Sequence, residues 1–287
     1  MVSLAGSPIP EGPSVRYHVS LRNMGSQATA ETLVACARAA EDSRVFEGAF
    51  VVDHLFIPPE ESEGSGGRTL EALVTLAFLA GATSRIRIGV SVLIAPYRPA
   101  LLTAKQVATI QELSGGRLIL GVGVGWMDAE FRALGVSRQR RGALTDALLG
   151  TIHDAFENDV IESNGQKVIF SPRPPRPPIW IGGRGEKAVE RAARYGDAYH
   201  PIAIRDEDLR ERAERLREAA ATLGRPTPAI ALYAPFDGSV DQLVDRLGEM
   251  KDLGVDDAVI AFGRYAGAEG FREKVARFAQ DVLPRLA

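Results

Sequence analysis

Short runs of apolar and β-branched residues alternate along the chain with longer segments in which apolar residues recur at helical spacing. We expect each short run to be a strand, because strands buried on both faces of a parallel sheet are mostly apolar. The expected strands are 15–21, 49–52, 86–93, 118–122, 179–181, 197–200, 230–234 and 258–262. Eight strands alternating with helices in 287 residues predict an α/β fold of the (β/α)8 TIM-barrel type, with a doubly wound sheet as the alternative.

Two segments interrupt this repeat. Residues 56–69 are rich in Pro, Glu, Ser and Gly, which favours a mobile loop after strand two. Residues 158–178, before strand five, contain an expected hairpin (160–171) across Asn164-Gly165, a dipeptide that favours a tight turn. No boundary separates two cores, so we expect one domain over residues 1–287 with these two insertions.

Composition narrows the class of protein. A formal net charge of −3 argues against a nucleic-acid-binding face, which needs an excess of basic residues. Cys36 is the only cysteine, which excludes an intramolecular disulfide and a Cys-based zinc site and fits a reducing cytoplasm. Residues 1–13 lack a signal-peptide pattern and no run of 18 apolar residues occurs, so we expect no secretion by that route and no membrane span. We also expect no metal site, because the chain has one cysteine and lacks the His-Glu-x-x-His motif.

Candidate chemistry lies at the ends of the expected strands. The serine-hydrolase elbow, the His-Glu-x-x-His zinc motif, the Walker motif and the dinucleotide-binding glycine motif are absent. Polar or glycine-rich positions follow strands two, four, five and six instead: Asp53-His54, 121–126, 182–185 and His200. Barrel enzymes place their sites at this end of the strands. A cap and a half-buried histidine would explain Asp53-His54 equally well, and close strand packing would explain the glycines of 121–126.

The segment Gly182-Gly183-Arg184-Gly185 joins a short apolar strand to an amphipathic helix. Backbone N–H groups at a glycine-rich helix N-terminus bind anions, and phosphate often sits at such late loops of a barrel. The cations Arg184 and Lys187 favour a phosphate site over a plain turn.

Several segments occur in an order that resembles a known family: 51–55, 87–93 with Arg98-Pro-Ala, 104–109, 113–118, 121–126 with Glu130-Phe, and 177–183. In these segments the chain resembles the luciferase-like monooxygenase superfamily and, within it, the branch of coenzyme F420-dependent (deazaflavin) oxidoreductases. The resemblance implies a (β/α)8 barrel that binds coenzyme F420, or alternatively FMN, across the C-terminal mouth, usually as a homodimer.

The resemblance also implies the residues of the site. Asp53 and His54 match a pair that faces the deazaflavin ring, and they are the expected catalytic residues. Ser91-Val92 matches a non-prolyl cis bulge behind the ring. In the sugar-phosphate dehydrogenases of this branch a glutamate stands where this chain has Trp126, so their proton donor is missing here. The residues expected at the cofactor are Asp53, His54, Ser91, Val92, Gly123, Gly125, Trp126, Gly182, Gly183, Arg184 and His200.

Three functions fit these features. The first is hydride transfer between the deazaflavin coenzyme and a small organic substrate, with His54 donating or accepting the proton. The second is an FMN-dependent monooxygenase, and the third is a flavin-binding protein without catalysis. A rim of basic residues around the cofactor site would favour coenzyme F420, because this coenzyme carries an oligoglutamate tail. The candidates for such a basic rim are Arg98, Arg173, Arg176, Arg184 and Lys187, which could equally be solvated surface residues. The substrate pocket is expected to include Tyr233, Phe262 and Arg264.

Overall fold

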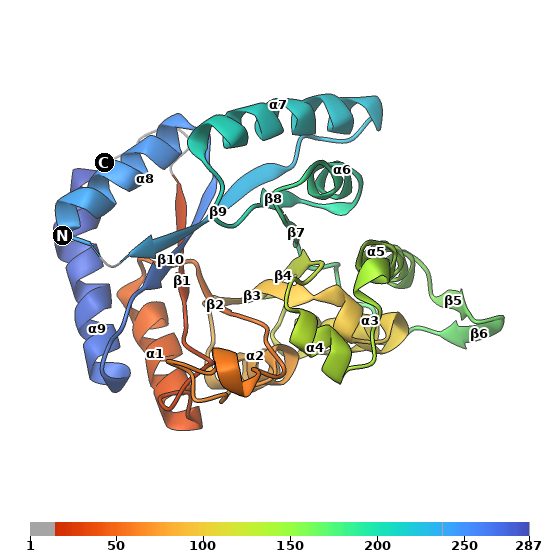
Figure 1. The fold of residues 1–287 in the computed structure, drawn as a ribbon, viewed down its shortest axis with the longest axis horizontal. Coiled ribbons are helices and arrows are strands. Elements are labelled where there is room, and N and C mark those ends of the chain that lie inside the picture. The colour runs from red at the N-terminus through yellow and green to blue at the C-terminus, as the bar shows by residue number, and fades with distance from the viewer. Residues whose placement is uncertain (1–14, 237, 287) are drawn as a thin grey trace, which may run out of the picture.

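Eight parallel strands close into a barrel in the order β1-β10-β9-β8-β7-β4-β3-β2 (Figure 1). The computed structural model describes residues 15–236 and 238–286, so residues 1–13, where no targeting segment is expected, lie outside the described part. All eight expected strands are present, with ends shifted by at most two residues. They are β1 (Arg16–Ser20), β2 (Gly48–Val51), β3 (Arg87–Ile94), β4 (Leu118–Gly123), β7 (Ile179–Gly182), β8 (Ala198–His200), β9 (Ala229–Phe236) and β10 (Asp257–Phe262).

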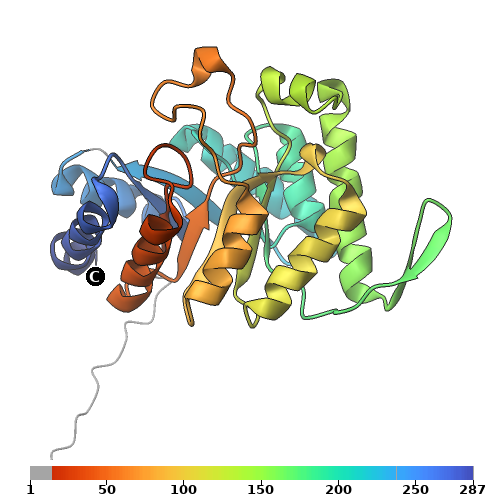
Figure 2. The ribbon, with the colours of Figure 1, turned by 90° about the horizontal axis from the view of Figure 1, so that it is seen from below.

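Helices surround the barrel on its outside, apart from α4 at the mouth (Figure 2). In α1, for example, Leu33, Ala37 and Ala40 form a buried stripe at helical spacing. Within the described residues, none of the helices has the length and apolar character needed to cross a lipid bilayer. The helices are α1 (Ala30–Ser43), α2 (Ala72–Ala82), α3 (Ala100–Leu113), α4 (Asp128–Ala133), α5 (Arg141–Glu157), α6 (Glu186–Tyr195), α7 (Asp206–Thr222), α8 (Val240–Asp252) and α9 (Gly267–Arg277).

The two insertions leave the barrel in different directions. The segment after β2 rises, together with α4, at the end of the barrel where the strands finish (Figure 2). The hairpin of β5 (Val160–Ser163) and β6 (Gln166–Ile169) projects sideways from the molecule and pairs only with itself. The expected hairpin is confirmed; its second strand, which the sequence predicts over 167–171, begins one residue earlier and ends two residues earlier. Only the first insertion therefore borders the mouth.

The interior of the barrel is filled by side chains. Phe50 and Trp180 stack with their ring centroids 5.0 Å apart, and Ile119, Ala231 and Val259 pack in the same buried cluster. A ligand therefore cannot pass through the barrel and has to bind at its mouth.

Val92 occupies space that three glycines leave open. The Ser91–Val92 peptide bond is cis, as the resemblance implies, and the β3–β4 register shifts between Val90 and Leu93. A Cβ added at Gly123 would lie 2.5 Å from Val92 Cγ2, and one at Gly182 would lie 3.0 Å from its Cγ1. Close packing against Val92 therefore explains glycine at both positions.

Gly121 lies under the same bulge, where a Cβ would overlap the carbonyl oxygen of Val90. We predict that Gly121→Ala lowers the free energy of unfolding by about 1 to 3 kcal/mol, because rigid backbone has to move. The matched control is Gly150→Ala in α5, where a Cβ meets no atom within 4 Å. It should raise the free energy by about 0.5 to 1 kcal/mol through its helix preference. Urea unfolding measures both; an unchanged Gly121→Ala variant would contradict the packing argument.

Candidate active site

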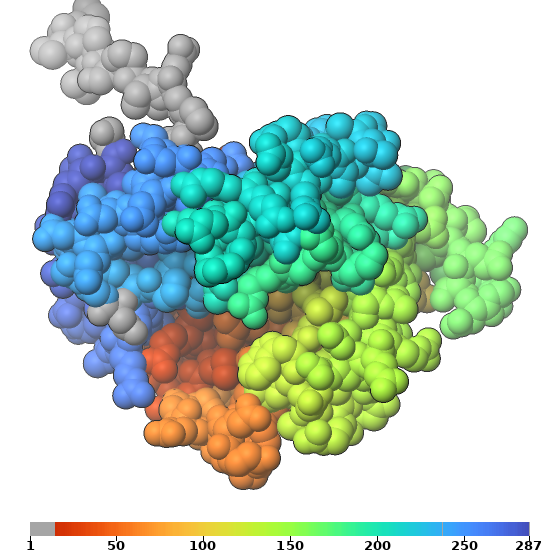
Figure 3. Space-filling model, turned by 45° about the horizontal axis from the view of Figure 1, so that its top comes forward, coloured from red at the N-terminus to blue at the C-terminus, as the bar shows by residue number. Residues whose placement is uncertain are grey.

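The carboxyl ends of the strands surround a cavity of about 680 Å³. The surface is hollowed there, between the segment after β2 and the segment around α4 (Figure 3). Ten of the eleven residues expected at the cofactor line this cavity, all except His200. The complete lining is Val52, Asp53, His54, Ser91, Val92, Ile94, Gly123, Val124, Gly125, Trp126, Gly182, Gly183, Arg184, Ile202, Ala203 and Tyr233.

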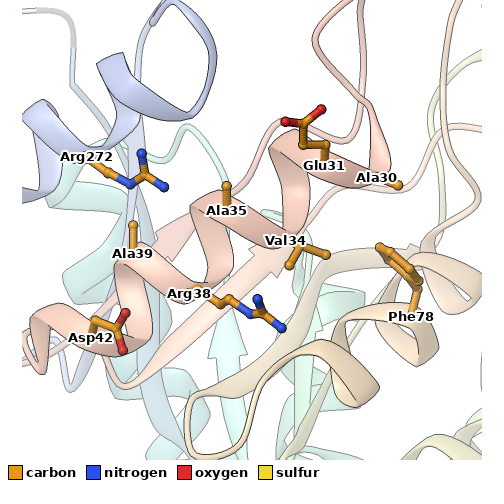
Figure 4. A pocket seen from close by; sticks show the side chains of 9 residues that line it. All are labelled: Ala30, Glu31, Val34, Ala35, Arg38, Ala39, Asp42, Phe78 and Arg272. Atoms are coloured by element: carbon orange, nitrogen blue, oxygen red, sulfur yellow. The ribbon is translucent and has the colours of Figure 1, made fainter.

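A second hollow lies on the outer face of α1 and has a different character (Figure 4). Its charged side chains do not converge: Glu31 and Asp42 lie at opposite ends of the helix. Arg38 donates a hydrogen bond to the carbonyl oxygen of Ala82 (3.0 Å) and so serves packing between α1 and α2. The mouth of the barrel is therefore the candidate active site.

Glu130 is the centre of a buried polar network beside this cavity. Glu130 is fully buried, with 0% exposure. Its carboxylate accepts hydrogen bonds from the backbone N–H groups of Leu55 (2.7 Å) and Phe56 (3.1 Å) and from the Tyr97 hydroxyl (3.1 Å). His54 Nδ1 lies 3.1 Å from the same carboxylate. Burial alone would raise the pKa of Glu130, but the hydrogen bonds from His54 and the backbone outweigh it, so the pKa is lowered. Glu130 is therefore an ionised acceptor.

The ionised carboxylate determines the tautomer of His54. Because Glu130 can only accept, Nδ1 of His54 carries the proton of their hydrogen bond, and Nε2 is the nitrogen that gains or loses a proton. The hydrogen bond to Glu130 raises the pKa of His54, although burial opposes the shift. The side chain is 19% exposed and meets the edge of the Trp126 ring. His54 is thus an oriented proton carrier that the cavity can reach.

Asp53 also lines the cavity, but its carboxylate is fully engaged. Arg98 binds both of its oxygens (2.7 and 2.8 Å), and the N–H of Ile94 donates to Oδ2 (2.8 Å). Arg98 also pairs with Glu71, which caps α2 by accepting from the N–H of Val74. Asp53 therefore joins the end of β2 to β3 and α2. Its geometry is that of a positioning residue, and His54 is the group free to exchange protons.

His200 does not lie in the cavity wall, in contrast to the expectation, because it is fully buried behind Ser91. Its Nδ1 donates to the carbonyl oxygen of Ala231 (2.9 Å), so Nε2 accepts from the Ser91 hydroxyl (2.7 Å). Burial lowers the pKa of His200 to about 4, which keeps the ring neutral at pH 7. His200 thus acts through Ser91, whose oxygen presents lone pairs to the cavity.

The loop before α6 provides an anion-binding geometry. Gly183 has a φ of +122°, a conformation that side chains with a Cβ rarely adopt. Gly185 caps α6 without a side-chain hydrogen bond. The N–H of Ala188 donates to the carbonyl oxygen of Gly185 (2.9 Å), but the N–H groups of Glu186 and Lys187 have no protein acceptor among the described residues. Arg184 lines the cavity beside them and donates to the carbonyl oxygen of Ala203 (3.2 Å). These are the features that a bound phosphate requires.

The prediction of a basic rim around the cofactor site is largely wrong. Arg98 is the buried partner of Asp53, with a side chain only 10% exposed. Arg173 and Arg176 precede β7 and pair with Asp159 and Asp197, so they lie at the barrel end opposite the mouth. Lys187 pairs with Glu190 on α6. Arg184 is the one candidate in the cavity wall.

Contacts between distant segments add residues to the candidate site that sequence reasoning missed. Glu130 occurs in a segment quoted for the resemblance, yet no local pattern shows that it is buried against His54. Tyr97 and Glu71 join the networks in the same way. Phe262, expected at the substrate pocket, is instead a core residue at 4% exposure.

A filled parallel barrel with a polar cavity across its C-terminal mouth is the arrangement of a barrel enzyme. The luciferase-like monooxygenase family model matches residues 14–242, and the chain belongs to this family. Two uncharacterized proteins of Mycobacterium tuberculosis are similar to it. One is 32% identical over 201 residues, covering 67% of this chain and 68% of that protein. The other is 30% identical over 277 residues, covering 89% and 93%.

Relatives with described activities differ in cofactor. An FMNH2-dependent dimethylsulfone monooxygenase of Pseudomonas putida is 29% identical over 173 residues, covering 56% of this chain and 47% of that protein. A monooxygenase of Streptomyces bottropensis superposes with a TM-score of 0.77 at 18% identity, covering 95% and 100%. An F420-dependent secondary alcohol dehydrogenase superposes with a TM-score of 0.76 at 15% identity, covering 95% and 99%. At these identities the superpositions show the fold alone.

We predict that Glu130→Gln lowers the pKa of His54, because the ionised acceptor is removed while burial remains. The raised pKa contributes stability at low pH, and this contribution is lost as pH rises through the folded-state pKa of His54. That pH dependence should weaken in the variant. Histidine NMR titration and unfolding at several pH values measure both effects.

The matched control is Glu157→Gln, which removes a carboxylate 3.9 Å from the exterior His153. It should leave the pKa of His54 unchanged. An unchanged His54 titration in Glu130→Gln would contradict the role assigned to the carboxylate.

Proposed function

We propose that this protein transfers a hydride between coenzyme F420 and a small organic substrate. The observation that carries the proposal is one cavity that combines an oriented proton carrier, His54, with a glycine-rich anion loop before α6. Membership of the luciferase-like monooxygenase family supports an oxidoreductase. The coenzyme, when bound, would supply the hydride chemistry of its ring.

The chain's own residues would bind, orient and move protons. The N–H groups of Gly183 and the first turn of α6, with Arg184, would hold the phosphate. Ser91 and Val92 would form the floor under the ring, with the Ser91 oxygen as a hydrogen-bond acceptor. His54 would exchange a proton at Nε2 while Glu130 holds the imidazole.

An FMN-dependent monooxygenase is the second candidate. It is favoured by the FMNH2-dependent relative and by the loss of the expected basic rim, because an FMN phosphate needs little beyond the anion loop. The choice of coenzyme F420 rests on the family resemblance and on Arg184 beside that loop. A binding protein without catalysis would not need the tautomer of His54 held by a buried carboxylate.

We predict that the purified protein binds coenzyme F420 more tightly than FMN, because the cation of Arg184 in the cavity wall would also attract the acidic tail beyond the phosphate. The preference should shrink as salt rises, since exposed charges are screened over about 8 to 10 Å at physiological ionic strength. Arg184→Gln should reduce it at low salt. The control, Arg194→Gln, changes an exposed arginine at the far end of α6. Fluorescence titration with both cofactors measures the preference; equal or tighter FMN binding at low salt would select the monooxygenase.

A substitution at Gly183, such as Gly183→Val, cannot separate an effect on phosphate binding from an effect on folding. A Cβ at φ +122° strains the backbone and would lie 3.0 Å from Ala188 Cβ, so the substitution would lower the stability of the fold as well as the cofactor affinity. Arg184→Gln changes no backbone conformation and separates the two effects.

His54→Ala should lower kcat by roughly 100-fold or more if Nε2 carries the catalytic proton. Cofactor affinity should change little, whereas the thermal midpoint should fall modestly, because buried Glu130 loses one of its four donors. His153→Ala, on α5 and outside the cavity, is the matched control. Turnover of cofactor-loaded enzyme, with affinity and melting measured beside it, tests the role. A rate that is unchanged, or that falls only with folding, would make His54 structural.

A further inference from the structure

The mouth of the barrel holds a second compartment of about 370 Å³. It shares Val52 and Tyr233 with the larger cavity, so the two are neighbours across the ends of β2 and β9. The larger cavity lies over β3, β4 and β7, whereas this compartment is bordered by residues that follow β1 and β10. A small molecule of modest size fits its volume.

Two arginines, Arg22 and Arg264, line this compartment. Neither has a carboxylate partner within 4.0 Å among residues 15–236 and 238–286. Arg22 is partly ordered by Tyr265: its guanidinium lies 5.8 Å from the centre of that ring, and its backbone N–H donates to the hydroxyl. The opposing charge in the lining is Glu63, on the segment after β2. The compartment thus has an excess of positive charge.

Tyr233 marks the boundary between the compartments. Its hydroxyl donates to Ser20 Oγ (3.3 Å), which ties β9 to β1. Burial raises the pKa of Tyr233, so the side chain stays a neutral phenol near pH 7. A molecule in the smaller compartment would therefore meet two arginines in the lining and a neutral polar boundary toward the larger cavity.

We propose that this compartment binds the substrate and that the substrate carries an anionic group, held by Arg22 and Arg264. Guanidinium groups bind carboxylates and phosphates through paired N–H donors, so the two share this recognition. The rest of the molecule extends past Val52 and Tyr233 toward the larger cavity. Its reaction there rests on the proposed function, whereas the anion site itself does not.

Binding of small probes to the cofactor-free full chain tests the anion site. The probes are benzoate, phenyl phosphate and the neutral benzamide, titrated by calorimetry at low salt. We expect at least one of the two anions to bind tenfold or more tightly than benzamide, and the stronger one identifies the anionic group. Arg22→Gln and Arg264→Gln should each weaken its binding at least fivefold, whereas Arg264→Lys should retain part of the affinity. Arg38→Gln, on the outer face of α1, is the charge-matched control.

Equal binding of benzamide and both anions would overturn the proposal, and so would unchanged anion affinity in both Gln variants with intact melting. Titration of coenzyme F420 and FMN in the same preparations keeps the two proposals distinguishable. Anion binding without binding of either cofactor would refute the proposed function alone. Cofactor binding and turnover without anion selectivity would refute the anion site alone.

Discussion

The site depends on one buried carboxylate. Glu130 is held by two backbone N–H groups of the segment after β2 and by the Tyr97 hydroxyl, and it in turn holds His54. An ionised carboxylate without water is costly unless its lone pairs are satisfied, and here four donors satisfy them. The same bonds that make Glu130 tolerable inside the protein attach α4 to the loop after β2 and orient the imidazole. The bonds that stabilise the mouth are therefore also those that orient the proposed proton carrier, His54.

A second network stabilises the opposite side of the same loop. Arg98 bridges Asp53 and Glu71 from a nearly buried position, so two carboxylates share one bidentate cation. Removing either partner of such a pair leaves an uncompensated charge, which costs more than the pair contributes to stability. Asp53 and His54 are neighbours in the chain but have different partners. The Asp53 carboxylate pairs with Arg98, whereas the His54 imidazole is hydrogen-bonded to Glu130.

The mouth of the barrel contains two neighbouring hollows that differ in the residues that line them. Val92 fills the space above Gly121, Gly123 and Gly182, so the glycines of β4 and β7 are explained by packing at the bulge. Beyond them lie Gly183 and the start of α6, which has no side-chain cap and is the anion site that we propose. Tyr233 then separates this cavity from the compartment with Arg22 and Arg264. In the proposed function, the cofactor and the anionic substrate therefore occupy neighbouring parts of the same end of the barrel, each beside arginine side chains.

The sequence by itself determined the eight strands, the hairpin and the segments that reach the mouth, because burial on a strand or helix follows the spacing of apolar residues along the chain. Which charged and polar side chains pair with one another was decided only by the tertiary structure. Glu130 lies 76 residues from His54, and Arg98 lies 45 from Asp53, so no local pattern encodes either pair. The same holds for His200, whose burial behind Ser91 follows from barrel closure. Charge pairing depends on which strand ends meet in space, and that is a property of the closed barrel.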